Sequence, residues 1–257
     1  MFLSEPQVTS ADLRFSLLGI PIRISAWFWL AALLFGWNIC QFFAAGDQRV
    51  LLQYLLLWTG AAFLSILIHE MGHALVYRYF GQDTQVVLYH FGGLTIPSMW
   101  GNRGARTPQQ QFLVSAAGPF AQLMFVSLMI AFFKMAGYSL PFPISSIGMK
   151  FGLYEGNEIN SPLLFAVVSF LIHINIFWPI LNLIPVPPLD GGQMVREGLL
   201  SCGVTDAARI ANIIGVGVGG SLRGMHIYED SRFLGLCSQC LQSLVISQFP
   251  VQGAGDS

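Results

Sequence analysis

Two histidines and a glutamate lie within five residues of one apolar segment, in the order His69-Glu70-Met71-Gly72-His73. Residues four apart lie on the same face of an α-helix, so both imidazoles can reach one metal ion. Ionisable side chains are costly in an apolar helix and usually serve a function there. This spacing therefore predicts a metal site, with His69 and His73 as two ligands and zinc as the expected ion.

Glu70 directly follows the first histidine. Zinc lowers the pKa of its bound water to about 7, and a carboxylate beside that water can accept its proton. The HExxH pattern is typical of zinc-dependent hydrolysis of peptide bonds, so we predict Glu70 as the general base. A set of satisfied polar residues between packed helices is the alternative interpretation.

A hydrolytic zinc site usually has three protein ligands and one open position for water. The other candidates for the third ligand are His90, His173, His226 and Asp190. Asp190 follows an apolar segment and three prolines, which end a helix, and the next two glycines allow a sharp turn. We expect this arrangement to hold the Asp190 carboxylate at the rim of the membrane.

The composition predicts that these residues are carried by membrane helices. Hydrophobic residues make up 54% of the 257 residues and charged residues 10%, whereas soluble domains carry about 25% charged residues. About 20 apolar residues span a bilayer. Four clear segments of this kind are found at 26–45, 51–79, 111–136 and 162–184, and two weaker ones at 207–222 and 233–251.

We therefore expect an all-α polytopic membrane protein with four to six transmembrane helices. Its membrane-embedded domain is predicted over residues 1–220, followed by an atypical C-terminal segment over residues 221–257. Alternate spans run in the same direction, so the second and fourth spans end on one face, which brings His69 near Asp190. The bias of Lys and Arg between the two sides predicts that this face is cytoplasmic. The net charge of -1 argues against a nucleic-acid partner.

The segment 84–97, between the second and third spans, has two β-rich runs around Gly92-Gly93. This pattern predicts a β-hairpin, and its apolar side chains place it at the membrane edge. An exposed hairpin edge can accept another extended chain by strand addition. A plain surface loop is the alternative interpretation.

These motifs together resemble the site-2 protease family of intramembrane zinc metalloproteases. The resemblance covers about residues 18–200 and rests on HEMGH in the second span, Phe91-Gly92-Gly93 in the hairpin, and the segment 182–192. The opening segment 19–24 and the aromatic first span are similar to the short, sporulation-protease-like branch. The resemblance implies one zinc ion per chain, with His69, His73 and Asp190 as ligands and Glu70 as the catalytic base. It also implies that Asn182 contacts the scissile carbonyl and that Gly92 and Gly93 help to receive an extended substrate.

The same resemblance implies that the protein hydrolyses peptide bonds in or near the transmembrane segments of membrane-anchored proteins. Anti-sigma factors and tethered regulators are such substrates, and regulated intramembrane proteolysis in the bacterial inner membrane is the expected setting. A catalytically inactive zinc-binding membrane protein is the alternative. The family often has Asn three residues after a Gly-Pro pair in the third span. Here Gly118-Pro119 is followed by Gln122, a change that we expect to affect helix packing more than chemistry.

Overall fold

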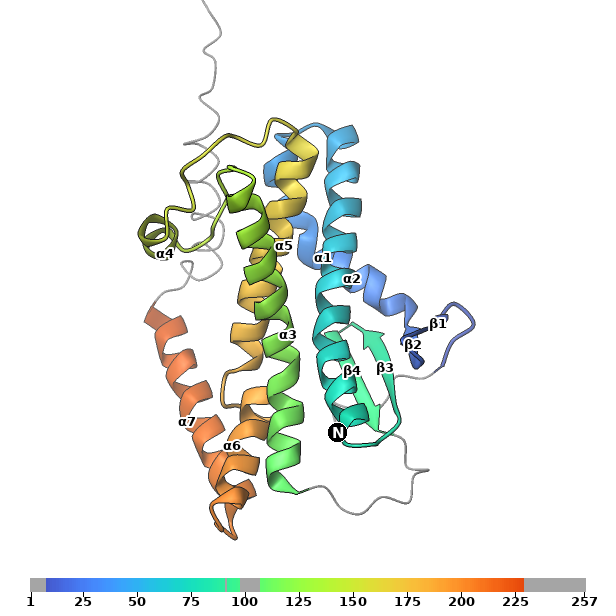
Figure 1. Cartoon of the computed structure of the whole chain (residues 1–257), viewed down its shortest axis with the longest axis vertical. Helices are drawn as coiled ribbons and strands as arrows, with labels where there is room; N and C mark the ends of the chain where they lie inside the picture. Colours follow the sequence, from blue (N-terminus) through green and yellow to red (C-terminus); the bar gives the residue numbers. More distant parts are fainter. Residues whose placement is uncertain (1–7, 91, 98–106, 229–257) are drawn as a thin grey trace, which may run out of the picture.

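Long helices form the centre of the molecule, with a small β-sheet on one side (Figure 1). The computed structural model describes residues 8–90, 92–97 and 107–228, with side chains through residue 218. The helices are α1 (Ala26–Ala44), α2 (Gln48–Tyr79), α3 (Pro108–Met135), α4 (Ser145–Lys150), α5 (Pro162–Asn182), α6 (Asp190–Ser201) and α7 (Ala207–Tyr228). The strands are β1 (Leu13–Leu17), β2 (Ile20–Ile24), β3 (Thr84–Tyr89) and β4 (Gly92–Pro97).

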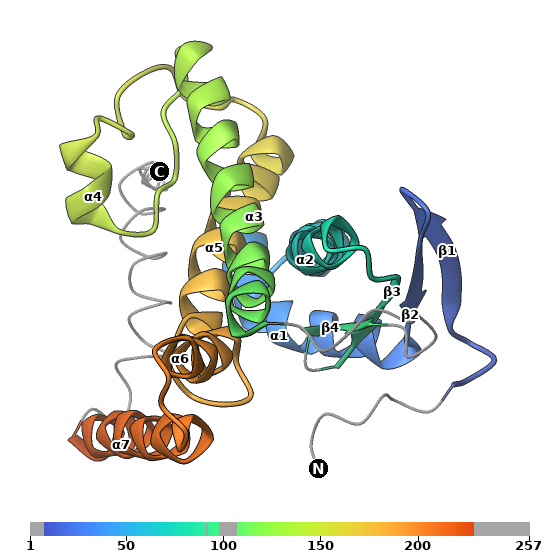
Figure 2. The same cartoon turned by 60° about the horizontal axis from the view of Figure 1, so that its bottom comes forward.

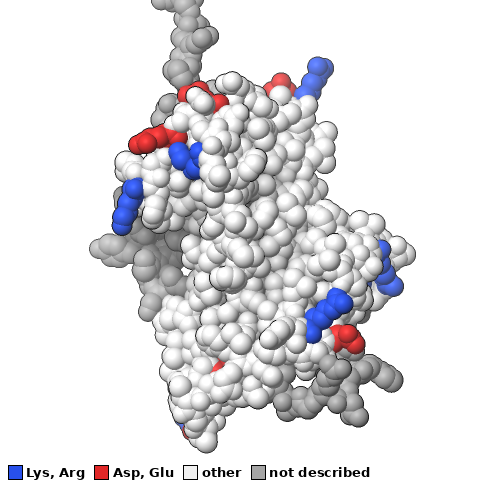
Figure 3. Space-filling view, viewed as in Figure 1, with Lys and Arg blue, Asp and Glu red and all other residues white. Residues whose placement is uncertain are grey.

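The four clear spans predicted from the sequence are helices α1, α2, α3 and α5. Each is long and apolar enough to cross a membrane. On the face drawn in Figure 3, charged side chains gather near the upper end and around the sheet, and a wide uncharged area lies between them. This distribution agrees with a bilayer around the middle of the helices.

Of the two weaker predicted spans, the structure describes the first but not the second. Residues 207–222 lie in α7, whose apolar part, Ala207–Val218, is shorter than the four spanning helices. The segment 233–251 lies outside the described residues. The predicted boundary between the membrane-embedded domain and the C-terminal segment, at residue 220, falls within helix α7. This boundary stays a prediction.

Helix α2 is the central element of the packing. It contacts α1, α3 and α5 as well as strands β3 and β4. About half of the apolar span of α2 (50%) is buried inside the protein, against 22% for α1 and α3. The HExxH segment therefore lies on a helix that is enclosed by other helices and by the sheet.

The sheet has the strand order β1-β2-β3-β4. The predicted hairpin is formed by the antiparallel pair β3 and β4, with Tyr89 opposite Gly92. Gly92 and Gly93 open the second strand and are not the turn of the hairpin; Phe91 lies outside the described residues. The membrane-edge position of this hairpin stays a prediction.

A second hairpin, β1–β2, makes the all-α expectation incomplete. Strand β2 pairs in parallel with β3, which joins the segment before α1 to the predicted hairpin. The signal was present in the sequence, because apolar residues alternate with other residues through Leu13–Leu17 and Ile20–Ile24 on either side of a Leu18-Gly19 turn. Ile22 and Val86 are buried against α2 in one hydrophobic cluster.

The chain after α5 also differs from the expectation. Asp190 and the two following glycines form the first turn of helix α6, whereas a sharp turn was predicted there. Helix α6 packs against α3 and α7, and Figure 2 shows it beside the ends of α3 and α5. The loop between α5 and α6 thus returns the chain toward α2, which brings the carboxylate to the histidines.

Candidate metal centre

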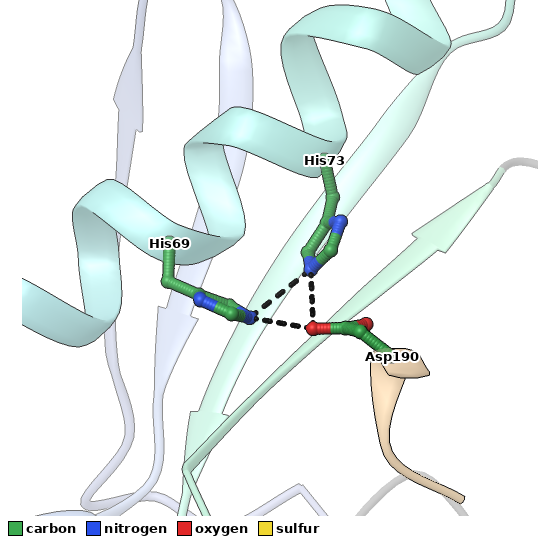
Figure 4. A group of neighbouring side chains, drawn as sticks. All are labelled: His69, His73 and Asp190. Atoms are coloured by element: carbon green, nitrogen blue, oxygen red, sulfur yellow. Dashed lines mark hydrogen bonds and ion pairs between the residues drawn. The ribbon is translucent and has the colours of Figure 1, made fainter. Parts of the chain in front are cut away.

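Three side chains from two distant parts of the chain converge on one point (Figure 4). Asp190 Oδ2 lies 3.0 Å from His69 Nε2 and 3.5 Å from His73 Nε2. The two Nε2 atoms are 3.1 Å apart. Both histidines are buried, with 2% and 7% of their surface exposed. The structure thus brings together the three residues that the sequence singled out as zinc ligands.

Helix α3 fixes the orientation of both imidazoles. His73 Nδ1 lies 2.7 Å from the carbonyl oxygen of Val114, and His69 Nδ1 lies 2.9 Å from Gln122 Oε1. A carbonyl oxygen can only accept a hydrogen bond, so His73 Nδ1 carries the proton. The Nε2 lone pair of His73 is then directed at the convergence point.

The donor set fits a zinc ion. Zinc in protein sites is bound by imidazole nitrogen and carboxylate oxygen at about 2.0–2.2 Å in tetrahedral geometry. Ligand atoms in such a tetrahedron are separated by about 3.3 Å, close to the 3.0, 3.1 and 3.5 Å separations found here. Two imidazoles and one carboxylate leave the fourth position for water or substrate.

The Asp190 carboxyl lies at the first position of α6. The N-terminal end of a helix favours a negative charge. This position therefore favours the ionised carboxylate that a metal ligand must offer.

Gly118 leaves the space in which the three candidate ligands meet. A Cβ atom on this residue of α3 would lie 2.3 Å from His73 Nε2 and 2.8 Å from His69 Nε2. Both contacts are shorter than any real Cβ contact, so a side chain at this position would collide with the ligand atoms. Gly118, which precedes Pro119, thus lies directly against the site.

Glu70 is held by strand β4. The Thr95 hydroxyl lies 2.8 Å from Glu70 Oε2 and 3.1 Å from the Glu70 carbonyl oxygen. A Cβ atom on Gly93 would lie 2.3 Å from Glu70 Cγ. The strand backbone therefore lies so close to the Glu70 side chain that only a glycine fits at this position. The candidate base therefore lies between its own helix and the edge strand of the sheet.

The remaining predicted residues lie around this centre. Gly92 pairs with Tyr89 at the start of β4 and is covered by the Trp178 ring, 2.7 Å from where a Cβ atom would be. The Asn182 amide donates to the Trp178 carbonyl, 3.0 Å away, and no described hydrogen bond joins Asn182 to the three convergent residues. A contact of Asn182 with substrate stays a prediction.

The other histidines do not join the cluster within the described residues. His90 lies in the hairpin turn and His173 stacks on Phe177 in α5, while the side chain of His226 lies outside the described part. The one described group of His, Cys, Asp and Glu residues able to hold a metal ion is His69, His73 and Asp190.

Three contacts of the site were not predicted from the sequence. Gln122 was expected to affect packing more than chemistry, but its amide oxygen contacts His69 directly. Thr95 and the Val114 carbonyl contact Glu70 and His73. The sequence offered one signal for Gln122, which is an amide in the middle of a largely apolar span. It offered none for the Val114 carbonyl, because every residue has one.

A helical fold with apolar spans and a convergent His-His-Asp cluster defines the class as a membrane protein with a candidate metal centre. Residues 59–219, more than half of the chain, match the family described as Peptidase family M50. The chain belongs to this family. The resemblance to the site-2 proteases is thereby confirmed, and with its four apolar helices the protein is an integral membrane protein.

Similar proteins include two curated relatives and one solved structure. The chain is 28% identical over 260 residues to "Putative zinc metalloprotease sll0528" of Synechocystis sp., covering 94% of this chain and 58% of the relative. It is 30% identical over 171 residues to "Putative zinc metalloprotease Rip3" of Mycobacterium tuberculosis, covering 65% and 38%. The chain thus spans about half the length of these relatives.

The fold is similar to that of the site-2 protease from Methanocaldococcus jannaschii. The TM-score is 0.50 at 18% sequence identity, and the match covers 96% of this chain and 98% of the other. At this identity the likeness concerns the fold alone.

Proposed function

We propose that this chain is an intramembrane zinc metalloprotease that hydrolyses peptide bonds in or near transmembrane segments of membrane-anchored proteins. The observation that carries the proposal is that Asp190 of α6 lies within 3.5 Å of His69 and His73, which share helix α2 with Glu70. Membership of a peptidase family supports hydrolysis as the use of this centre.

In the proposed mechanism, His69, His73 and Asp190 hold one zinc ion. A zinc ion held there would supply Lewis acidity toward the scissile carbonyl and a water molecule. Glu70 accepts the proton of that water on its carboxylate and later gives it to the leaving amine. The Thr95 hydroxyl and the Gly93 backbone keep the Glu70 carboxylate in one position during both transfers.

We further propose that the substrate binds as an extended strand along β4. Strand β4 is at the edge of the described sheet, paired only with β3 there, and it contacts Glu70 through Thr95 and Gly93. Strand addition satisfies the backbone hydrogen-bonding groups of a peptide that has left its helix. Such unwinding is needed because the carbonyls of a helix are already hydrogen-bonded.

The proposed orientation places the active site toward the cytoplasm of a bacterial inner membrane. It is supported by the Lys and Arg bias of the sequence and by the position of the HExxH segment near the C-terminal end of α2. An anti-sigma factor or another tethered regulator fits the proposed substrate class.

Replacement of Thr95 by Val is expected to reduce kcat about ten- to a hundredfold, because a hydrogen bond to a charged group contributes about 1.5–3 kcal/mol. Val has nearly the shape of Thr but has no hydroxyl for Glu70. Zinc content and KM should change little. The Thr95→Ser variant keeps the hydroxyl and should retain most of the activity; equal loss in both variants would show that the methyl group, and not the hydrogen bond, matters.

Metal removal tests the proposed function itself. The purified chain in detergent or liposomes is expected to contain one zinc per chain and to cleave at least one member of a panel of single-span proteins. A zinc chelator should abolish cleavage, and added zinc should restore it. Zinc binding without cleavage of any panel member would favour the inactive zinc-binding alternative. Failure to bind zinc at all would overturn the proposal.

A further inference from the structure

We infer that Gln122 is a positioning residue for the metal centre, because it sets which nitrogen of His69 faces the metal. This inference rests on the proposed zinc site and concerns a residue that belongs to neither the ligand set nor the HExxH motif. Gln122 lies on α3, is 0% exposed, and bridges two residues of α2 that are one helical turn apart.

The hydrogen bonds of Gln122 determine which way its amide points. Its Nε2 lies 3.0 Å from the backbone carbonyl oxygen of Ser65, and its Oε1 lies 2.9 Å from His69 Nδ1. A carbonyl oxygen has no proton to give, so the amide nitrogen must face Ser65. The amide oxygen must then face His69, and as an acceptor it requires a proton on His69 Nδ1. The lone pair of His69 Nε2 is thereby left for a metal ion.

The Ser65 end of the bridge is held in place from a third helix. Asn175 of α5 donates one amide hydrogen to Ser65 Oγ at 2.7 Å and the other to the Leu171 carbonyl at 2.9 Å. Asn175 and Gln122 are both fully buried. Unpaired polar groups in such a position cost about 1–3 kcal/mol each, so these contacts resist rearrangement.

Helix α3 presents matching groups at a spacing of four residues. The Val114 carbonyl accepts from His73 Nδ1, Gly118 leaves room for the ligand atoms, and Gln122 accepts from His69 Nδ1. Positions four apart lie on one helix face, as do His69 and His73 on α2. One face of α3 therefore orients both imidazoles, and Gln122 is the member of this face that acts through its side chain.

The test compares zinc affinity in two substitutions of Gln122. The Gln122→Met variant keeps the length of the side chain but offers His69 no acceptor of comparable strength. Loss of an outer partner of a metal-bound histidine typically lowers metal affinity 10–100-fold, and we expect a loss in this range in chelator competition. The Gln122→Glu variant keeps an acceptor oxygen for His69 but loses the donor to the Ser65 carbonyl, so its zinc affinity should fall less than that of Gln122→Met. The Gln111→Met variant, the same change on the same helix but away from the histidines, serves as the control.

Two spectroscopic readouts report the geometry directly. The visible spectrum of the Co²⁺-loaded protein should change in Gln122→Met and remain unchanged in Gln111→Met. In the unmodified, zinc-loaded protein with ¹⁵N-labelled histidine, NMR should show His69 Nδ1 protonated and Nε2 bound to the metal. This second measurement needs no variant of Gln122, so it decides the question even if Gln122→Met does not fold.

Several outcomes would overturn the inference. Unchanged zinc affinity and cobalt spectrum in Gln122→Met would do so, and so would an unprotonated His69 Nδ1 in the unmodified protein. Equal loss of affinity in folded Gln122→Met and Gln122→Glu would show that the acceptor is not what matters. Failure of the proposed function is distinguishable from these results, because then the unmodified protein itself would bind no zinc or would cleave nothing.

Discussion

Replacement of Glu70 by Gln is expected to leave zinc binding intact and to reduce peptide-bond cleavage by about 10²–10⁴-fold, the usual contribution of a general base. Gln has nearly the size of Glu and can still contact the Thr95 hydroxyl, but its amide cannot take a proton from water at neutral pH. Glu70 is not one of the three convergent ligands, so the metal should stay in place.

The measurement pairs zinc content with single-turnover cleavage of a substrate that the unmodified protein accepts. Glu158→Gln is a matched control, because Glu158 is an exposed residue in the segment between α4 and α5, which lies at the other end of the molecule in Figure 1. Activity close to that of the unmodified protein in Glu70→Gln would rule out Glu70 as the base. Loss of zinc together with activity would instead assign it a role in metal binding.

Replacement of Gly118 by Ala should have the largest effect on the metal itself. The added methyl group would lie 2.3 Å from His73 Nε2 and 2.8 Å from His69 Nε2. Because α3 is packed between α2, α5 and α6, it cannot move away without loss of other contacts. We expect zinc affinity to fall at least about a hundredfold, or roughly 2.7 kcal/mol, and activity to be lost with it.

Gly60→Ala is the matched control for this prediction. Gly60 lies on α2, and a Cβ atom there would meet nothing within 4 Å. The same chemical change should therefore leave zinc affinity and activity unchanged, and the thermal stability of the protein equal or slightly higher. If Gly118→Ala bound zinc as well as Gly60→Ala does, α3 would not lie against the metal ligands as described.

These effects share one physical origin. Helix α3 contributes no metal ligand, yet Gly118, Gln122 and the Val114 carbonyl determine the space and the orientation of both histidines. Strand β4 has the corresponding role for Glu70, through Thr95 and Gly93. The reacting groups come from α2 and α6, whereas the groups that orient them come from elements that the motif does not include.

The amino-acid sequence was sufficient to predict the local features of this protein. Apolar segments of about 20 residues predicted α1, α2, α3 and α5 to within a few residues, because length and hydropathy alone decide whether a helix can cross a bilayer. The HExxH spacing placed His69 and His73 on one face of α2, because the period of the helix does so in any helix. Alternation and glycines likewise predicted the β3–β4 hairpin.

What only the tertiary structure decided is how distant residues meet. The pairing of β2 with β3 joins residues about sixty positions apart, and no local pattern specifies such a partner. The contact of Gln122 with His69 depends on the packing of α3 against α2, which fixes which residues of α3 face the histidines. Asp190 reaches the histidines because its two glycines continue into α6 and do not form a turn. Residue types and periods thus predicted the candidate ligands, and packing between elements determined the geometry around them.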